Sequence, residues 1–281
     1  MGLYRMETFM NNLPKTVNEV LTQYFDLINS RLPNIFDGFY LYGSISLGAF
    51  DKEFSDIDFM AVTKRELIKK DVIILKQIHS IIKNKFHDTD LDGRYIQKMN
   101  LNGSAKRAEL CLKLLDGKLK FERFDLNTID AYQLKKYGIT IIGQEPRTFN
   151  YEVDWNILLK NMQINLNTYW QDWKTSCERF LSIRFVSSFF SLKMIEWAVT
   201  GVSRQYFTFR EKDIISKIGA GEYALNMLPE RWHKIINESM RLRKGISKSY
   251  YESVVERRKD TLGYIGFIIS ESNRLFEEGK V

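Results

Sequence analysis

Apolar residues recur every three or four positions in two early stretches of the chain, which is the spacing of one face of an α-helix. These stretches are residues 14–31 and 64–86. Between and after them lie short runs of β-prone residues, several of which end at turn signals: residues 39–42, 57–62, 94–99 and 139–142. This alternation predicts a sheet that is flanked by helices.

The pattern changes after a break near residues 143–146, and from residue 152 onward the helical spacing continues to the end. Five helices are predicted there: residues 154–169, 180–200, 212–227, 230–244 and 249–276. Gly201 is predicted to end one of them. The expected fold is therefore α+β, with a mixed sheet and its helices in residues 1–149 and an all-helical bundle in residues 150–281.

Composition narrows the class of protein. The 281 residues are 44% hydrophobic and 27% charged, which is typical of a soluble globular protein. The sequence contains no run of about 18 apolar residues, so no membrane span is predicted. The first residues lack the pattern of a secretory signal. Only Cys111 and Cys177 are present, without metal-ligand spacing. We expect a cytoplasmic monomer that has no membrane partner.

The net charge of +7 raises the question of a nucleic-acid partner. The excess is spread along the chain: residues 1–150 carry 22 Lys and Arg against 19 Asp and Glu, and residues 151–281 carry 20 against 16. Neither half contains a basic arm or tail. The charge therefore indicates a solvated surface, and no nucleic-acid partner is expected.

Candidate chemistry gathers around the first two predicted strands. Gly43 and Ser44 follow the first strand, and Asp56 and Asp58 stand where the second begins. Residues two apart in a strand face the same side, so these carboxylates lie about 7 Å apart and repel each other unless a cation lies between them. Carboxylate oxygens suit Mg²⁺, and a glycine backbone approaches a phosphate closely. The pattern indicates a nucleotide site, with a polar-edged hairpin as the plain structural alternative.

Phosphoryl transfer at such a site still needs a third carboxylate, which shares a metal ion or accepts the proton of the attacking hydroxyl. Asp88, Asp90 and Asp92 lie just before the predicted strand 94–99, and Asp92 is placed at its start. Aspartate also favours turns, so the residues alone leave a catalytic role and a loop role equally open.

The phrase Leu41-Tyr42-Gly43-Ser44, followed by Gly48 and Ser55-Asp56-Ile57-Asp58, resembles the signature of the nucleotidyltransferase superfamily that includes DNA polymerase beta. More narrowly, it is similar to the aminoglycoside adenylyltransferases of the spectinomycin and streptomycin type. Shorter phrases similar to that family recur later: residues 138–146, 198–201 and 222–229. The resemblance covers nearly the whole chain, with about a dozen extra residues between Gly201 and Lys217.

This resemblance implies that residues 1–149 form a nucleotidyltransferase catalytic domain that uses ATP. Two Mg²⁺ ions are expected on three carboxylates: Asp56, Asp58 and Asp92. Asp92 matches the position of the family's catalytic base, although the family has glutamate there, and Asp90 is the reserve candidate. Gly43 and Ser44 are expected to hold the β- and γ-phosphates.

The resemblance also assigns residues in the helical domain. Lys217 matches a family lysine and Lys193 a family arginine, and both are expected on the triphosphate, against the alternative of ordinary surface charges. Three residues lie about where the family contacts the antibiotic: Trp173, Asp172 and Glu178. The family's acidic phrase before the long helix is replaced by residues 181–185, and Trp170 and Trp173 are equally interpretable as core aromatics.

The expected activity is transfer of AMP from ATP to a hydroxyl group of an aminoglycoside-type antibiotic, spectinomycin or streptomycin, with release of pyrophosphate and antibiotic resistance as the result. One alternative is transfer to a protein or tRNA hydroxyl, as in the small nucleotidyltransferase antitoxins, which are shorter and lack a helical half. The other is a nucleotide- or antibiotic-binding protein without catalysis, which only the aspartate at position 92 supports.

Overall fold

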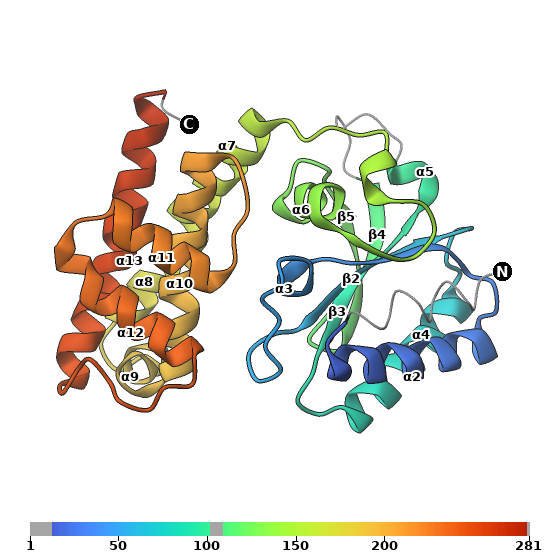
Figure 1. Cartoon of the computed structure of the whole chain (residues 1–281), viewed down its shortest axis with the longest axis horizontal. Helices are drawn as coiled ribbons and strands as arrows, with labels where there is room; N and C mark the ends of the chain where they lie inside the picture. Colours follow the sequence, from blue (N-terminus) through green and yellow to red (C-terminus); the bar gives the residue numbers. More distant parts are fainter. Residues whose placement is uncertain (1–12, 102–108, 280–281) are drawn as a thin grey trace. The chain divides into compact units, whose positions relative to one another are not determined.

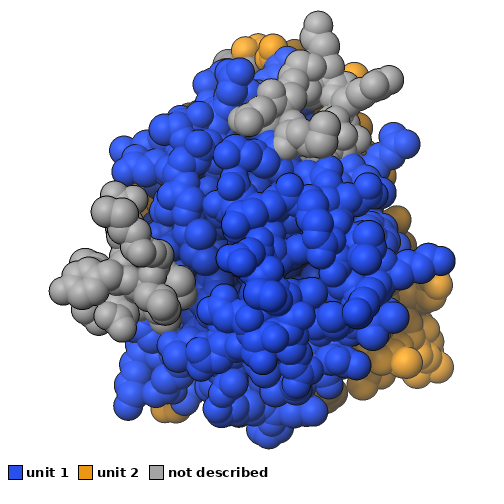
Figure 2. All heavy atoms as spheres, turned by 90° about the vertical axis from the view of Figure 1, so that its right-hand side faces the viewer, with its two compact units in different colours: residues 1–154 blue, residues 155–281 orange. Residues whose placement is uncertain are grey.

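The computed structural model describes residues 13–101 and 109–279, which divide into two compact units. Unit 1 extends to Asp154 and unit 2 begins at Trp155, and the two are coloured separately in Figure 2. Unit 1 contains a mixed sheet with helices, and unit 2 is helical (Figure 1). In the described residues, no helix combines the length and the apolar character that crossing a membrane requires.

Unit 1 is built on a six-stranded sheet in the order β5-β4-β3-β2-β1-β6. The strands are β1 Phe36–Leu41, β2 Ile57–Thr63, β3 Leu91–Gln97, β4 Glu109–Leu115, β5 Lys118–Phe124 and β6 Ile139–Ile142. Only β2 and β3 run parallel, and α4 (Lys69–Lys85) connects them. All other neighbours are antiparallel. This parallel pair carries two of the three predicted catalytic carboxylates.

Each face of the sheet has its own core, because successive residues of a strand point to opposite sides. α2 (Lys15–Arg31) and α4 cover one face and bury Phe39 and Phe59 (Figure 1). On the other face, Tyr40 and Met60 pack in one cluster with residues of α6 (Ile129–Tyr137). Short helical segments complete unit 1: α3 Gly43–Ser46, α5 Lys98–Leu101 and a 3-10 turn at Pro146–Thr148. By the same alternation, Asp58 and Asp92 belong to the face of α6.

The core beneath α2 and α4 contains a buried chain of polar groups. His79 Nε2 hydrogen-bonds the Tyr95 hydroxyl, which lies 2.8 Å from the Tyr24 hydroxyl. Burial lowers the pKa of His79 to about 3, so the imidazole is neutral in the folded protein at neutral pH.

We therefore expect unit 1 to lose stability as the pH falls from about 6.5, the pKa of an unfolded histidine, toward 3. Between these two pKa values only the unfolded chain takes up the proton. The difference in free energy of unfolding between the wild type and His79→Gln should therefore shrink by about 1.4 kcal/mol for each unit that the pH falls. Hydrogen exchange of β2 and β3 amides measures unit 1 alone. A difference that stays constant from about pH 6 to 4 would contradict this prediction.

Unit 2 contains seven α-helices in its described residues, against the five predicted. They are α7 Trp155–Asn165, α8 Gln171–Glu178, α9 Ile183–Phe190, α10 Leu192–Glu211, α11 Lys217–Met227, α12 His233–Arg243 and α13 Val254–Glu277. A π-helical turn, Leu166–Trp170, joins α7 to α8, and a 3-10 turn, Glu230–Trp232, precedes α12. α10 is central, because it packs against α11, α12 and α13.

Two helix predictions in unit 2 were wrong. The predicted helix 180–200 is divided at Ser191, whose hydroxyl accepts a hydrogen bond from the Met194 amide and starts α10. Gly201 does not end α10, which continues to Glu211. This glycine instead makes room for packing, since an added Cβ would lie 3.0 Å from the Trp170 indole. A glycine that ends a helix and a glycine that makes room for a neighbouring side chain cannot be told apart in the sequence.

Unit 1 also departs from the predictions. β3 begins at Leu91, so Asp92 lies inside the strand, and the strand ends at Gln97. β4 and β5 were not predicted, although Asp116-Gly117 between them is a typical hairpin signal. The helix predicted for residues 64–86 begins only at Lys69.

Candidate active site

The end of β1 turns tightly against the carboxylate of Asp58. Gly43 has a φ of +64°, and an added Cβ there would lie 1.8 Å from Asp58 Oδ2. The amide of Tyr42 donates a hydrogen bond of 3.1 Å to the carbonyl oxygen of Asp58. Only glycine fits both the backbone conformation and the contact. The fold therefore brings the predicted phosphate turn and a predicted metal ligand together.

A side chain from α6 holds this turn in place. Gln133 is buried, and its Nε2 donates 2.8 Å to the Gly43 carbonyl and 3.3 Å to the Ser46 hydroxyl. The Ser46 hydroxyl in turn donates 3.1 Å to the Gly43 carbonyl. Gln133 was missed in the sequence, where nothing local distinguishes it from other polar residues of a helix.

The hydroxyl of Ser44 lies beside the turn. Its oxygen is buried and has no hydrogen-bond partner among the residues that the structure describes. A buried hydroxyl without a partner costs about 1–3 kcal/mol, so a ligand oxygen at this place would relieve a cost that the protein otherwise bears. This fits the role predicted for Gly43 and Ser44 in holding phosphate.

Removing the Gln133 amide should weaken nucleotide binding more than it slows the chemical step. In Gln133→Leu the turn loses its anchor, and the loss of one hydrogen bond of about 1–1.5 kcal/mol corresponds to a KM for ATP that rises roughly tenfold. Steady-state kinetics with varied ATP test this. Gln163→Leu removes a side-chain hydrogen bond to Asn273 in unit 2 and is the matched control. An unchanged KM in a folded Gln133→Leu would contradict the anchoring role.

Asp58 and Asp92 are direct neighbours across the parallel strands. Paired residues of adjacent strands are about 4.8 Å apart and share a face, so both carboxylates stand on the side of α6. Gly93 keeps the strands tightly packed, because an added Cβ would lie 2.1 Å from the Phe59 carbonyl oxygen. Asp58 is half-buried and Asp92 is buried, whereas Asp56 is exposed.

The surroundings of Asp92 change its pKa strongly. Burial raises its pKa to about 7, and the nearby Asp56 carboxylate adds to the effect, followed by Asp90 and Asp116. The amide of Asp116 opposes them by donating 3.1 Å to Asp92 Oδ1. Asp116 and Gly117 have φ values of +49° and +72°, so the hairpin turn between β4 and β5 aims this amide at Asp92.

Asp90 is the reserve candidate for the base, and the structure gives it other partners. It lies just before β3, and its carboxylate forms an ion pair with Lys83 of α4. Its carbonyl oxygen accepts a 2.7 Å hydrogen bond from the amide of Ile57. Asp92 stands directly beside Asp58 instead, so the register favours Asp92.

Arg94 supports the same face of β3 two residues further on. Its guanidinium donates 2.6 Å to Asp130 of α6 and 3.2 Å to Glu122 of β5, and it lies over the Phe124 ring. These contacts tie the sheet to α6, the helix that also carries Gln133. The sequence alone did not point to Arg94, because its partners Glu122 and Asp130 are distant in the chain.

The carboxylates fit Mg²⁺ as an open set of ligands. In residues 13–101 and 109–279, no group of three His, Cys, Asp or Glu side chains encloses a metal position. However, Asp56 and Asp92 are near enough for repulsion to raise the pKa of Asp92, which a cation would relieve. Mg²⁺ usually takes only one or two carboxylates and completes its shell with phosphates and water. Asp56, Asp58 and Asp92 are therefore the residues that would hold it.

The lysines predicted to bind phosphate lie in unit 2. Lys217 is the first residue of α11, after the helix-capping Ser216, and its Nζ lies 3.4 Å from Oε1 of Glu196. Lys193 lies in the first turn of α10 and is exposed. Both positions suit a cation that meets an anionic ligand, but their roles remain predictions.

The predicted antibiotic contacts differ in their exposure. Trp173 is only 4% exposed and packs against Trp170 and Trp197, which favours the interpretation as a core aromatic. Asp172 and Glu178 are exposed residues of α8, and Glu178 forms a 2.6 Å ion pair with Lys174. Of the three, the two carboxylates are therefore better placed to meet a cationic ligand.

Comparison with known proteins supports the resemblance seen in the sequence. Residues 197–264, which include Lys217, match the family model of the aminoglycoside adenylyltransferase C-terminal domain. No curated protein matches the chain in sequence. The solved structure of spectinomycin adenyltransferase AAD(9) from Enterococcus faecialis, with ATP and spectinomycin, is similar in fold. The TM-score is 0.65 at 16% identity, over 90% of this chain and 98% of that chain. The predicted α+β fold is thereby confirmed.

Proposed function

We propose that the protein transfers AMP from ATP to a hydroxyl group of an aminoglycoside-type antibiotic, releases pyrophosphate and so confers resistance. The observation that carries this proposal is the pairing of Asp58 with Asp92 beside the Gly43–Ser44 turn. The matched family model and the fold of AAD(9) support the class of acceptor. Spectinomycin and streptomycin are the first acceptors to test, and we expect a cytoplasmic monomer.

In this reaction the acceptor oxygen forms a bond to the α-phosphorus, and the bond from that phosphorus to the bridging β-phosphate oxygen breaks. The acceptor's proton passes to Asp92, because this carboxylate is buried on the sheet face of α6 and stands directly beside Asp58. When bound to Asp56, Asp58 and Asp92, Mg²⁺ would supply positive charge for the phosphates.

The remaining residues bind and orient the two substrates. The Gly43 backbone and the Ser44 hydroxyl contact the β- and γ-phosphates, and Gln133 holds that turn in place. Lys217 and Lys193 neutralise charge on the triphosphate. Asp172 and Glu178 contact cationic groups of the antibiotic, since a polycation requires carboxylate partners.

Turnover of the full chain with ATP, Mg²⁺ and a panel of aminoglycosides tests the proposal. We expect pyrophosphate release that depends on the antibiotic, together with an antibiotic product that carries an added AMP group in mass spectrometry. Addition of a chelator should stop both. If no member of the panel stimulates release, the acceptor class is wrong. Labelled AMP on a protein or a tRNA would then support the alternative transferase.

A further inference from the structure

Two glutamates are buried among the helices of unit 2. Glu196 of α10 is 3% exposed, and Glu238 of α12 is completely buried. A buried carboxylate is costly unless cations and hydrogen bonds compensate its charge. The charges of the two glutamates are compensated in different ways. This difference indicates a structural role for Glu238 and a role in ligand binding for Glu196.

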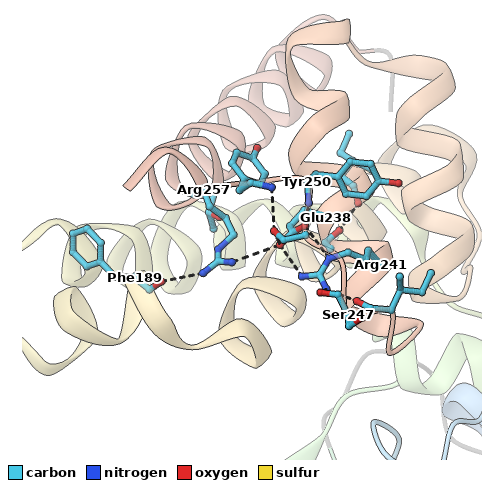
Figure 3. Close-up of polar contacts among 12 residues, drawn as sticks. Phe189, Glu238, Arg241, Ser247, Tyr250 and Arg257 are labelled. Atoms are coloured by element: carbon cyan, nitrogen blue, oxygen red, sulfur yellow. Dashed lines mark hydrogen bonds and ion pairs between the residues drawn. The ribbon is translucent and has the colours of Figure 1, made fainter. Parts of the chain in front are cut away.

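Glu238 lies in a closed network of short contacts (Figure 3). Arg241 donates to both carboxylate oxygens, at 2.9 and 2.8 Å, and the Ser249 hydroxyl and the Tyr250 amide donate at 2.8 and 3.0 Å. Arg257 lies 3.6 Å away. Because the acceptor is surrounded by donors, this network serves to fix the segment between α12 and α13.

The Glu196 carboxylate instead makes longer contacts, with two cations from two other helices and with the Thr200 hydroxyl, which donates to Oε1 at 3.4 Å. Lys217 Nζ lies 3.4 and 3.5 Å from the carboxylate oxygens, and Arg243 Nη1 of α12 lies 3.8 Å away. Charge-assisted hydrogen bonds are typically about 2.7–2.9 Å long. The first turn of α11 and the last residue of α12 therefore meet at one carboxylate without the short bonds that Glu238 makes.

The surroundings of Lys217 disfavour its charge. Burial lowers the pKa of Lys217, Glu196 opposes that effect, and Arg243 and Arg204 add repulsion. The charged groups around this ammonium are thus Glu196 and Arg204 of α10 and Arg243 of α12. Cations gathered in this way are stabilised further by a second anion.

We propose that Glu196 is the positioning residue of an oxyanion site in unit 2, where it holds Lys217 in place for the phosphate oxygens of the nucleotide. Arg243 is the second cation on the same carboxylate. The Lys217 side chain is 23% exposed and the Glu196 side chain 3%, so Glu196 acts through the lysine and does not reach the ligand itself. A glutamate orients a phosphate-binding lysine in the same way in protein kinases. The inference rests on the proposed function, because it requires that the protein binds ATP.

The test is calorimetry on the full chain with Mg²⁺ and a non-hydrolysable ATP analogue. Glu196→Gln should bind about tenfold more weakly at pH 8, by analogy with metal sites, where loss of a group that orients a ligand has an effect of this size. Removing the carboxylate lowers the pKa of Lys217 further, so the alkaline loss of binding should begin at a lower pH than in the wild type. The ratio of variant to wild-type affinity cancels the titration of the nucleotide; it should stay below one at neutral pH and fall further as the pH rises.

Three variants accompany this measurement. Glu238→Gln is the matched control, which should lower the melting temperature but leave the affinity unchanged. Glu196→Asp keeps the negative charge but moves the carboxylate away from Lys217, so it should weaken nucleotide binding. This variant remains informative if Glu196→Gln does not fold. Adding Glu196→Gln to Lys217→Ala should cause no further loss, because the glutamate acts through the lysine.

Unchanged or tighter nucleotide binding in Glu196→Gln would overturn the positioning role. Tighter binding would mean that the carboxylate merely competes with phosphate for Lys217. Additive losses in the double variant would overturn it as well. A wild type that does not bind the ATP analogue would refute the proposed function together with this inference. A wild type that binds normally beside an unaffected Glu196→Gln would refute the inference alone.

Discussion

Asp58→Asn should reduce turnover at least about 100-fold while the fold survives, in line with the loss of a group that organises charge in phosphoryl transfer. The substitution keeps the shape of the side chain and removes its charge. Asp58 touches the Gly43 turn and pairs in register with Asp92, so its charge acts on both the phosphate and the base. Pyrophosphate release measures the loss, and circular dichroism checks the fold.

A matched control distinguishes this effect from a general loss of negative charge. Asp37 lies in β1, and its surface carboxylate forms a 2.9 Å ion pair with Lys98, which Asp37→Asn removes. Exposed ion pairs contribute only about 0–1 kcal/mol, so this variant should keep nearly normal turnover. Near wild-type turnover of Asp58→Asn itself would refute its assignment as a metal ligand.

Asp92→Asn should abolish transfer and leave ATP binding within a few-fold of the wild type, because a base acts on the acceptor's proton rather than on the nucleotide. The amide nitrogen that replaces an oxygen accepts no proton. The side-chain carbonyl oxygen of the asparagine can still accept the hydrogen bond from the Asp116 amide, so the fold should persist. Binding of a non-hydrolysable analogue and single-turnover transfer separate the two effects.

Asp90→Asn is the comparison for this prediction. Asp90 pairs with Lys83 and lies outside the strand, so its loss should cost far less turnover than the loss of Asp92. If Asp90→Asn is the inactive variant and Asp92→Asn keeps its activity, Asp90 is the base. The pairing of Asp92 with Asp58 would then serve only the structure of the sheet.

The amino-acid sequence alone predicted the two-part α+β organisation and the approximate position of most elements. It also pointed to Gly43, Ser44, Asp56 and Asp58, because these residues lie within one short segment. In such a segment the strand period and the turn chemistry are set by near neighbours, so the chemistry can be inferred without the fold. The third carboxylate was open between Asp90 and Asp92 for the opposite reason, since the choice depends on how β3 pairs with β2.

Tertiary structure decided what depends on contacts between distant segments. Gln133 reaches the Gly43 turn from 90 residues away, and the Asp116 amide reaches Asp92 across the β4–β5 hairpin. Trp173 is a core residue because Trp170 and Trp197 surround it, and Lys217 meets Glu196 because α10 and α11 pack together. Each of these side chains has an ordinary local sequence, and its role comes from burial and from partners that only the folded chain brings within reach.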